Sequence, residues 1–211
     1  MLFVTAFVVG LSGAMVPGPL TVVLTRHALR GGLRAGPLIT LGHGLLEALI
    51  VVLLLFGLDS LLARDQVVGI IGLTGGLVLI WMGSGIFRSP GTPPSLEEEK
   101  ENEDQGPGSF LAGMVATISN PYWFLWWATV GATYVALSRE QGVQGVLLFF
   151  SGHLLADFAW LMLLALALVT GRRFFTDRIY RGVMKFLGLM LVILAGYFIW
   201  SGLQFLGFVQ L

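Results

Sequence analysis

Two short stretches of this chain place a histidine and a carboxylate four residues apart, inside segments that are otherwise almost uncharged. They are Gly42-His43-Gly44-Leu45-Leu46-Glu47 and Gly152-His153-Leu154-Leu155-Ala156-Asp157, and both read Gly-His-x-Leu-x-acid. On a helix, residues four apart share one face, with Cβ atoms about 5–6 Å apart. Each pair can be neutral overall, as an ion pair or as two uncharged groups, which suits proton uptake or exchange for a cation. The residues predicted to bind substrate or couple to protons are therefore His43, Glu47, His153 and Asp157.

The same four side chains are suited to two other roles. Two histidines and two carboxylates can ligate zinc, manganese or iron, so a divalent-metal site is the alternative if the two helices are adjacent. Each pair could instead be a hydrogen bond that joins two helices. Ionisable groups at mid-membrane depth are costly, which favours a working role. No resident cofactor is expected, because the metal enters only as the substrate of the alternative.

The elements that must position these residues are membrane helices. The chain has 211 residues, is 56% hydrophobic and only 11% charged, whereas about 25% of a soluble domain is charged. About 20 apolar residues cross the hydrocarbon core of a bilayer. Met1 to Val9 is apolar without a basic region, so it is interpreted as the start of a span rather than a signal peptide. The six predicted spans are residues 1–24, 36–58, 66–87, 110–137, 143–169 and 184–208.

Prolines interrupt the first and the fourth predicted spans. Each proline removes a backbone donor and disrupts the preceding helical turn, and in lipid the freed carbonyls need new partners. These breaks are expected to line the transport pathway and to offer backbone contacts to a substrate. The residues that form them are Pro17, Gly18, Pro19, Asn120 and Pro121.

Side chains near the breaks are secondary candidates. The hydroxyls concerned are Thr21, Thr117 and Ser119, and the aromatic side chains are Tyr122, Trp123, Phe124, Trp126 and Trp127. For the aromatic group, lipid or core packing is favoured over the lining of a vestibule. His27 lies in a basic loop and is interpreted as an ordinary surface residue.

Three features recur in the same order in both halves: a proline break, a histidine–acid pair, and a span with Gly-Leu near its start and Ser-Gly near its end. The pattern indicates a duplication, with a first three-helix repeat at 1–87, an acidic linker at 88–109 and a second repeat at 110–211. Three spans per copy invert the second copy. The expected fold is therefore an all-α integral membrane protein of six helices in two inverted repeats, with helices one and four interrupted, a plan that recurs among secondary transporters.

Charge placement predicts the orientation. With the N-terminus outside, the inner loops hold ten of the lysines and arginines and the outer loops two, as the positive-inside rule requires. We expect a multi-pass protein of the inner (plasma) membrane with both termini on the outer side. The acidic linker is then a cytoplasmic tether; a partner-binding tail on a non-transporting scaffold is the alternative.

Composition excludes several other classes. A formal net charge of zero gives no support for nucleic-acid binding, and the absence of cysteine excludes disulfide and thiolate chemistry. No His-Glu-x-x-His or other protease motif accompanies the histidines, so an enzyme is not expected. The expected partners are a small-molecule or ion substrate and membrane lipid. Gly72 and Gly76 form a small-xxx-small pair that predicts close packing within the first half, with a homodimer interface as the alternative.

The stretch Val16-Pro17-Gly18-Pro19-Leu20, followed by the basic glycine-rich Arg30-Gly31-Gly32-Leu33-Arg34-Ala35-Gly36, resembles the opening of the lysine-exporter (LysE) family of amino-acid exporters. Asn120-Pro121 with the aromatics after it resembles that family's motif in the second half. The resemblance covers most of the chain in layout and implies export of small solutes, typically amino acids or their derivatives, driven by an ion gradient. We therefore expect a secondary transporter that exports a small polar solute, an amino acid or related amine, by alternating access, as an antiporter coupled to a proton gradient. The wider superfamily also contains metal-ion exporters. The histidines in both halves depart from the family's pattern, so the resemblance predicts the fold but does not identify the substrate.

Overall fold

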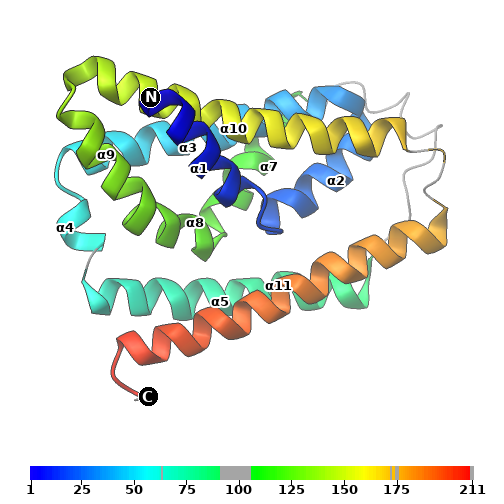
Figure 1. Cartoon of the computed structure of the whole chain (residues 1–211). Helices are drawn as coiled ribbons and strands as arrows, with labels where there is room; N and C mark the ends of the chain where they lie inside the picture. The colour runs from blue at the N-terminus through cyan, green and yellow to red at the C-terminus, as the bar shows by residue number, and fades with distance from the viewer. Residues whose placement is uncertain (63, 91–105, 172, 174–175, 210–211) are drawn as a thin grey trace.

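The computed structural model describes residues 1–62, 64–90, 106–171, 173 and 176–209, and these fold into helices without a strand (Figure 1). The first half contains α1 (Leu2–Ala14), α2 (Pro19–Gly31), the 3-10 turn η1 (Gly32–Arg34), α3 (Ala35–Leu55), α4 (Asp59–Leu62) and α5 (Asp65–Arg88). The second half contains α7 (Gly106–Ile118), α8 (Pro121–Trp126), the π-helix η2 (Trp127–Gly131), α9 (Ala132–Arg139), α10 (Gly142–Thr170) and α11 (Asp177–Phe205).

Among the described residues, four helical segments are long and apolar enough to cross a membrane: Pro19–Leu55, Asp65–Arg88, Gly142–Thr170 and Asp177–Phe205. The first of them joins α2, η1 and α3, and the chain turns at Gly32, whose φ of +67° favours glycine. Two shorter apolar helices, Leu2–Ala14 and Gly108–Ile118, add to these. The prediction of an all-helical membrane protein is therefore confirmed.

Both predicted interruptions are present. The first predicted span is divided into α1 and α2, and the fourth into α7 and the run from α8 to α9. The last predicted span starts earlier than expected, at Asp177, because Thr176 caps α11 by accepting a hydrogen bond from the Ile179 amide at 3.3 Å. Arg178 and Arg181 consequently lie on the helix itself. The acidic run at 97–104 lies outside the described residues.

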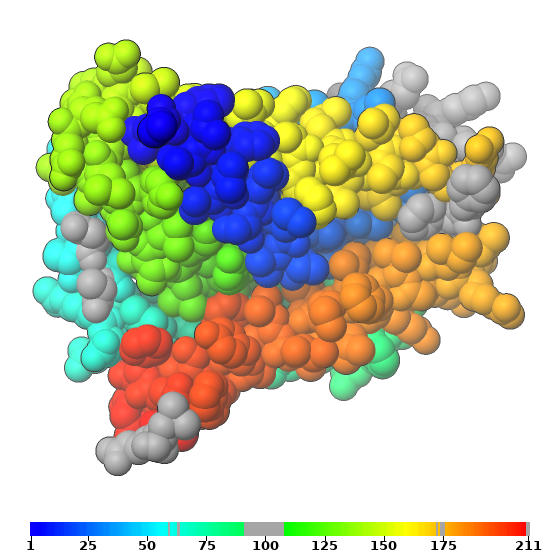
Figure 2. Space-filling model, in the orientation of Figure 1, coloured from blue at the N-terminus to red at the C-terminus, as the bar shows by residue number. Residues whose placement is uncertain are grey.

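Helices α5 and α11 lie side by side and form one layer of the molecule, below the other helices in the view of Figures 1 and 2. Glycines allow the close approach: a Cβ at Gly83 would lie 2.6 Å from the Gly188 carbonyl oxygen, and one at Gly72 would lie 2.9 Å from that of Phe198. Small residues of this kind bring membrane helices together. Gly72 and Gly76 therefore pack within the chain, but between its two halves, and the expectation of packing within the first half is wrong.

The second layer is built from two similar helix contacts. Helix α1 lies along α10, where a Cβ at Gly152 would collide with the carbonyl oxygen of Phe3 (Figure 2). Helix α7 lies along α3, where a Cβ at Gly42 would collide with the carbonyl oxygen of Phe110. These two glycines stand directly before His43 and His153, so the closest helix contacts hold the two histidines in place.

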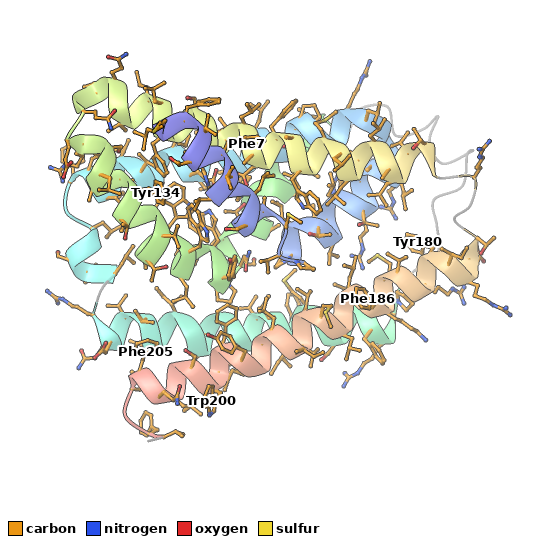
Figure 3. The ribbon with its side chains drawn as sticks, in the orientation of Figure 1. Phe7, Tyr134, Tyr180, Phe186, Trp200 and Phe205 are labelled. Carbon is orange, nitrogen blue, oxygen red and sulfur yellow. The ribbon has the colours of Figure 1, made fainter. Side chains whose placement is uncertain are left out.

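Large apolar side chains cover the outside of the bundle. Trp81 on α5 is 77% exposed and Tyr197 on α11 is 58% exposed. Trp200 and Phe205 lie along the same α11 (Figure 3) and are each 45% exposed. An apolar exterior of this extent is suited to contact with acyl chains rather than water.

Candidate functional site

The two helix breaks face each other in the middle of the bundle. After Val16, the prolines at 17 and 19 cannot continue a helix, and Gly18 is extended, with φ −148° and ψ −171°. On the other side, Asn120 ends the break by capping α8, because its Oδ1 accepts a hydrogen bond from the Tyr122 amide at 3.1 Å. A Cβ at Gly18 would lie 3.5 Å from the Asn120 Nδ2 atom, so the two breaks are in contact.

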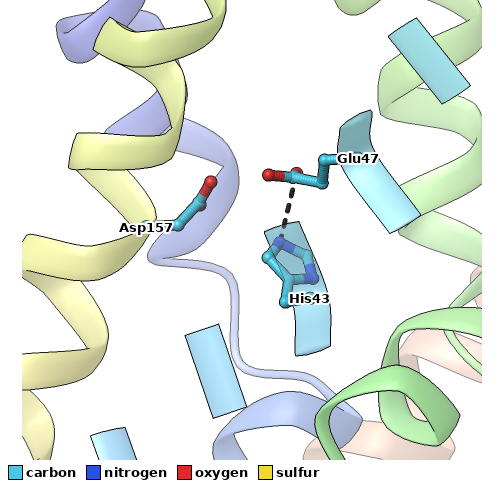
Figure 4. Close-up of side chains that lie close together, drawn as sticks. All are labelled: His43, Glu47 and Asp157. Carbon is cyan, nitrogen blue, oxygen red and sulfur yellow. Dashed lines mark ion pairs between the residues drawn. The ribbon is translucent and has the colours of Figure 1, made fainter. Parts of the chain in front are cut away.

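The four predicted ionisable residues lie beside these breaks, and α3 and α10 are adjacent as the metal alternative required. Glu47 Oε1 is 3.1 Å from His43 Nε2 and 2.9 Å from His153 Nε2, so this carboxylate joins the two halves. Asp157 Oδ2 is 3.4 Å from His153 Nε2, an ion-pair distance without hydrogen-bond geometry. Figure 4 shows the Asp157 carboxylate directed toward Glu47, across from the His43–Glu47 pair.

These side chains are removed from solvent, yet several of their polar atoms have no partner. Glu47 is only 1% exposed, and His153 and Asp157 are 3% and 4% exposed. Within the described residues, Glu47 Oε2, Asp157 Oδ2 and His153 Nδ1 make no hydrogen bond. Buried polar atoms of native proteins nearly always have a partner, so these atoms are available to hydrogen-bond a bound solute or water.

A cavity of about 60 Å³ connects the breaks with the ionisable groups. Gly18 and Asn120 line it from the breaks, together with Thr21 and all four ionisable residues. Pro17, Pro19 and Pro121 are not among the lining residues: they shape the breaks, and Pro121 also packs against Gly75 of α5. The predicted site residues thus lie around one cavity, and the three prolines lie next to it without lining it.

Aromatic side chains enclose His153. The ring of Trp126 stacks on the imidazole with 4.7 Å between centroids, and Trp127 meets it edge-on at 5.1 Å. Phe149, four residues before His153 on α10, stacks at 6.1 Å and was not singled out from the sequence, although its spacing could have identified it.

The tryptophans after Pro121 both pack in the core and line the cavity. Trp123, Trp126 and Trp127 are buried and are lining residues as well. The π-helix that begins at Trp127 changes the side-chain register at this point, and such wider turns are frequent at functional sites. The indole N–H groups of Trp123 and Trp127 have no acceptor among the described residues.

The secondary candidates named from the sequence differ in whether they contact the ionisable residues. Thr117 is buried and its hydroxyl lies 2.8 Å from His43 Nδ1, whereas Ser119 is turned back to the Val115 carbonyl oxygen at 2.7 Å. His27 is not an ordinary surface residue: it is half-buried, and its Nδ1 lies 3.0 Å from the hydroxyl of buried Ser109 at the start of α7.

The four donors of the metal alternative do not converge on one point. Ligand atoms of His43, Glu47 and Asp157 lie within 4.8 Å of one another (Figure 4), but His153 does not join this group. Both nitrogens of His43 already face protein partners, and His153 Nε2 faces Glu47. Three of the four predicted ligands are therefore close enough to share one ion, and His153 lies outside that group.

Apolar helices broken at a buried polar cavity are typical of membrane transport proteins. A sequence profile of the LysE type translocator family matches residues 11–202, and the chain belongs to this family. It is therefore a membrane translocator for a small solute and not an enzyme, as the sequence predicted.

Three relatives are similar over most of their length. The "Chemotactic transduction protein ChpE" of Pseudomonas aeruginosa is 30% identical over 75% of this chain and 78% of its own. The "Putative amino acid efflux protein YcgF" of Bacillus subtilis is 23% identical over 96% of this chain and 97% of its own. The "Uncharacterized membrane protein YahN" of Escherichia coli is 28% identical over 88% of this chain and 83% of its own. No solved structure gave a significant match.

Proposed function

We propose that this protein is an inner-membrane secondary transporter that exports a small polar solute, an amino acid or related amine, in exchange for protons. In this proposal Glu47 and Asp157 bind the substrate ammonium or a proton, and His43 and His153 adjust their charge. The helix breaks offer backbone groups to the rest of the substrate. The printed name of the Bacillus subtilis relative, an amino acid efflux protein, agrees with this substrate class.

The observation that carries the proposal is the set of unpaired polar atoms around one cavity. Two carboxylate oxygens, Glu47 Oε2 and Asp157 Oδ2, are acceptors for an ammonium group. Two indole N–H groups, on Trp123 and Trp127, are donors for a carboxylate. An amino acid carries both complementary groups, whereas a metal ion would use only the acceptors.

Alternating access between inverted repeats requires the helices around the breaks to move, so that the cavity opens to each side of the membrane in turn. The paired contacts of Phe3 with Gly152 and of Phe110 with Gly42 support two copies related by inversion.

Counterflow in proteoliposomes tests the proposal. Vesicles are loaded with a mixture of proteinogenic L-amino acids and their decarboxylated amines, and uptake of each labelled compound is measured. Loss of one charge-assisted hydrogen bond lowers binding by at least about tenfold, so Glu47→Gln and Asp157→Asn should each reduce uptake by that factor or more. The matched control is Glu140→Gln, which changes an exposed carboxylate at the end of α9.

Two results would contradict the proposal. One is transport at the wild-type rate by the double variant Glu47→Gln with Asp157→Asn. The other is a wild-type protein that moves none of these compounds but retains a divalent metal at stoichiometric amounts after purification, which would support metal export.

A further inference from the structure

Thr21 lines the cavity near the start of α2, and its hydroxyl is not bonded back into the helix as those of other threonines are. Thr25 bonds the Thr21 carbonyl oxygen, one turn back, at 2.8 Å. Thr40 bonds the carbonyl oxygen one turn back on α3 at the same distance. For Thr21, the residue one turn back is Pro17, which lies in the break before α2. Among the described residues the Thr21 hydroxyl has no hydrogen-bond partner, so it can donate to a solute in the cavity.

Trp123 occupies the equivalent place in the second half. Each helix that follows a break begins with a proline, Pro19 in α2 and Pro121 in α8, after an extended residue. Thr21 and Trp123 each come two residues after that proline, and both line the cavity. Trp123 is 8% exposed, and its indole N–H has no acceptor within the described residues. Because helix side chains tilt toward the N-terminus of their helix, both donors lean toward the breaks.

The cavity therefore offers two chemically different sets of groups. The carboxylates of Glu47 and Asp157 come from α3 and α10, and both histidine Nε2 atoms already face them. At the breaks, Asn120 Oδ1 accepts from the Tyr122 amide, so the Nδ2 end of this side chain is the one that faces Gly18. No lysine or arginine is among the described residues that line the cavity. Neutral donors at the breaks are therefore the groups left for a substrate carboxylate.

We propose that Thr21 is a specificity-determining residue whose hydroxyl, together with the Trp123 indole N–H, binds the carboxylate of the substrate. The two donors come from opposite halves of the chain, and the substrate ammonium faces the carboxylates of α3 and α10. The site selects solutes that carry both an ammonium group and a free carboxylate. It rejects the decarboxylated amine, because the amine leaves both donors without an acceptor. This inference rests on the proposed function and adds a residue that decides between amino acid and amine.

Equilibrium binding to the purified protein tests the role of Thr21. Isothermal titration calorimetry in detergent gives the dissociation constants of proteinogenic L-amino acids, each paired with the amine formed by its decarboxylation. Thr21→Val removes the hydroxyl and keeps the branched shape of the side chain. It should weaken binding of the amino acids by about tenfold or more, the value of one hydrogen bond to a charged group, and leave binding of the amines unchanged. Thr21→Ser restores a hydroxyl and should bind as the wild-type protein does.

Thr40→Val is the matched control for the loss of a hydroxyl. Thr40 is buried, its hydroxyl is bonded within α3, and it is not among the residues that line the cavity. This variant should bind amino acids and amines as the wild-type protein does. Unchanged binding of amino acids by Thr21→Val, or an equal loss for amino acids and amines, would overturn the inference and leave the proposed function intact.

A second measurement uses the wild-type protein alone, so it does not depend on the folding of Thr21→Val. Each amino acid is compared with its amide, which keeps the ammonium group and loses the charge of the carboxylate. The amide should bind about tenfold more weakly or less tightly still, since hydrogen bonds to charged groups are the stronger ones. Equal binding of acid and amide would overturn the inference. A wild-type protein that binds neither amino acids nor amines would overturn the proposed function, and the inference with it.

Discussion

At the scale of single residues, the Glu47 carboxylate connects the two halves of the molecule. Glu47 Oε1 contacts a histidine from each half, at 3.1 Å and 2.9 Å, while the ion pair of Asp157 among the described residues is with His153, at 3.4 Å. Such a buried network has large energetic consequences in a low-dielectric interior, because each polar group that loses its partner stays desolvated.

Removing the charge of Glu47 should therefore destabilise the protein more than removing that of Asp157. Breaking a buried charged pair costs about 3–5 kcal/mol, so Glu47→Gln is expected to lower the melting temperature clearly and Asp157→Asn less. Thermal unfolding in detergent, followed by tryptophan fluorescence, measures the difference, with Glu140→Gln as the exposed control. Equal melting temperatures for the wild-type protein and the three variants would contradict the central role given to the Glu47 contacts.

The unpaired indoles should determine preference for a free carboxylate. Trp123→Phe and Trp127→Phe each remove one N–H donor and are expected to weaken amino-acid binding by about tenfold, the value of one hydrogen bond to a charged group. Binding of the corresponding decarboxylated amine should change little. Trp81→Phe on the exposed face of α5 is the control. The assignment would be wrong if both compounds lost affinity equally.

The sequence predicted which histidine and carboxylate side chains share a helix face, but not the residues that surround them. The spacing of His43 and Glu47 places them on one helix face in any fold. Thr117 and Trp127 contact the histidines from other helices, and these contacts depend on how each helix is rotated about its axis. A nearly uniform apolar sequence does not specify that rotation, so neither partner could be assigned before the structure.

At the scale of elements, two devices position the site: broken helices and glycine contacts. Helix α1 ends at Ala14, before Pro17, and Asn120 caps the start of α8, so both breaks lie at the polar cavity and leave backbone groups free at that depth. Glycines at 72, 83, 188 and 202 bring α5 and α11 into contact along much of their length.

The close contact of α5 and α11 should tolerate no side chain at Gly83. A Cβ there would lie 2.6 Å from the Gly188 carbonyl oxygen, whereas a Cβ at Gly85 meets no atom within 4 Å. Gly83→Leu is therefore expected to lose folded protein, and Gly85→Leu to remain folded. Yield and elution of monodisperse protein on size-exclusion chromatography measure both variants. Equal behaviour would show that the two helices are not held by this contact.

Most element positions could be predicted, because length, apolar content and proline determine them. The α5 helix and both interruptions fall where the sequence indicated. The start of α11 was missed, since Arg178 and Arg181 precede the predicted span, although Thr176 was available as a helix cap. The helix that packs against Gly72 was assigned wrongly, because a pair of small residues in the sequence does not indicate which helix lies against it.

At the scale of the whole molecule, the arrangement of the ends bears on orientation. Both termini lie at one end of the bundle with α4 and the α9–α10 turn, while the α2–α3 turn and the start of α11 lie at the other (Figure 1). The second end carries the basic residues Arg30, Arg34, Arg178 and Lys185. By the positive-inside rule we expect this end to face the cytoplasm.

Cysteine labelling should confirm that orientation. The chain contains no cysteine, so a single substitution at an exposed position introduces one thiol that alone can be labelled. Gln141→Cys, between α9 and α10, is expected to react with a membrane-impermeant maleimide in intact cells. Gly182→Cys, near the start of α11, should react only after permeabilisation. The reverse pattern would place both termini in the cytoplasm.

An experimental structure with a transported amino acid bound tests the central claim most directly. The account predicts that the substrate lies between α3 and α10, with its ammonium within about 3 Å of a Glu47 or Asp157 oxygen, and with Gly18 and Asn120 beside it. Substrate density at another place, with the two carboxylates still paired only to histidine, would contradict the account.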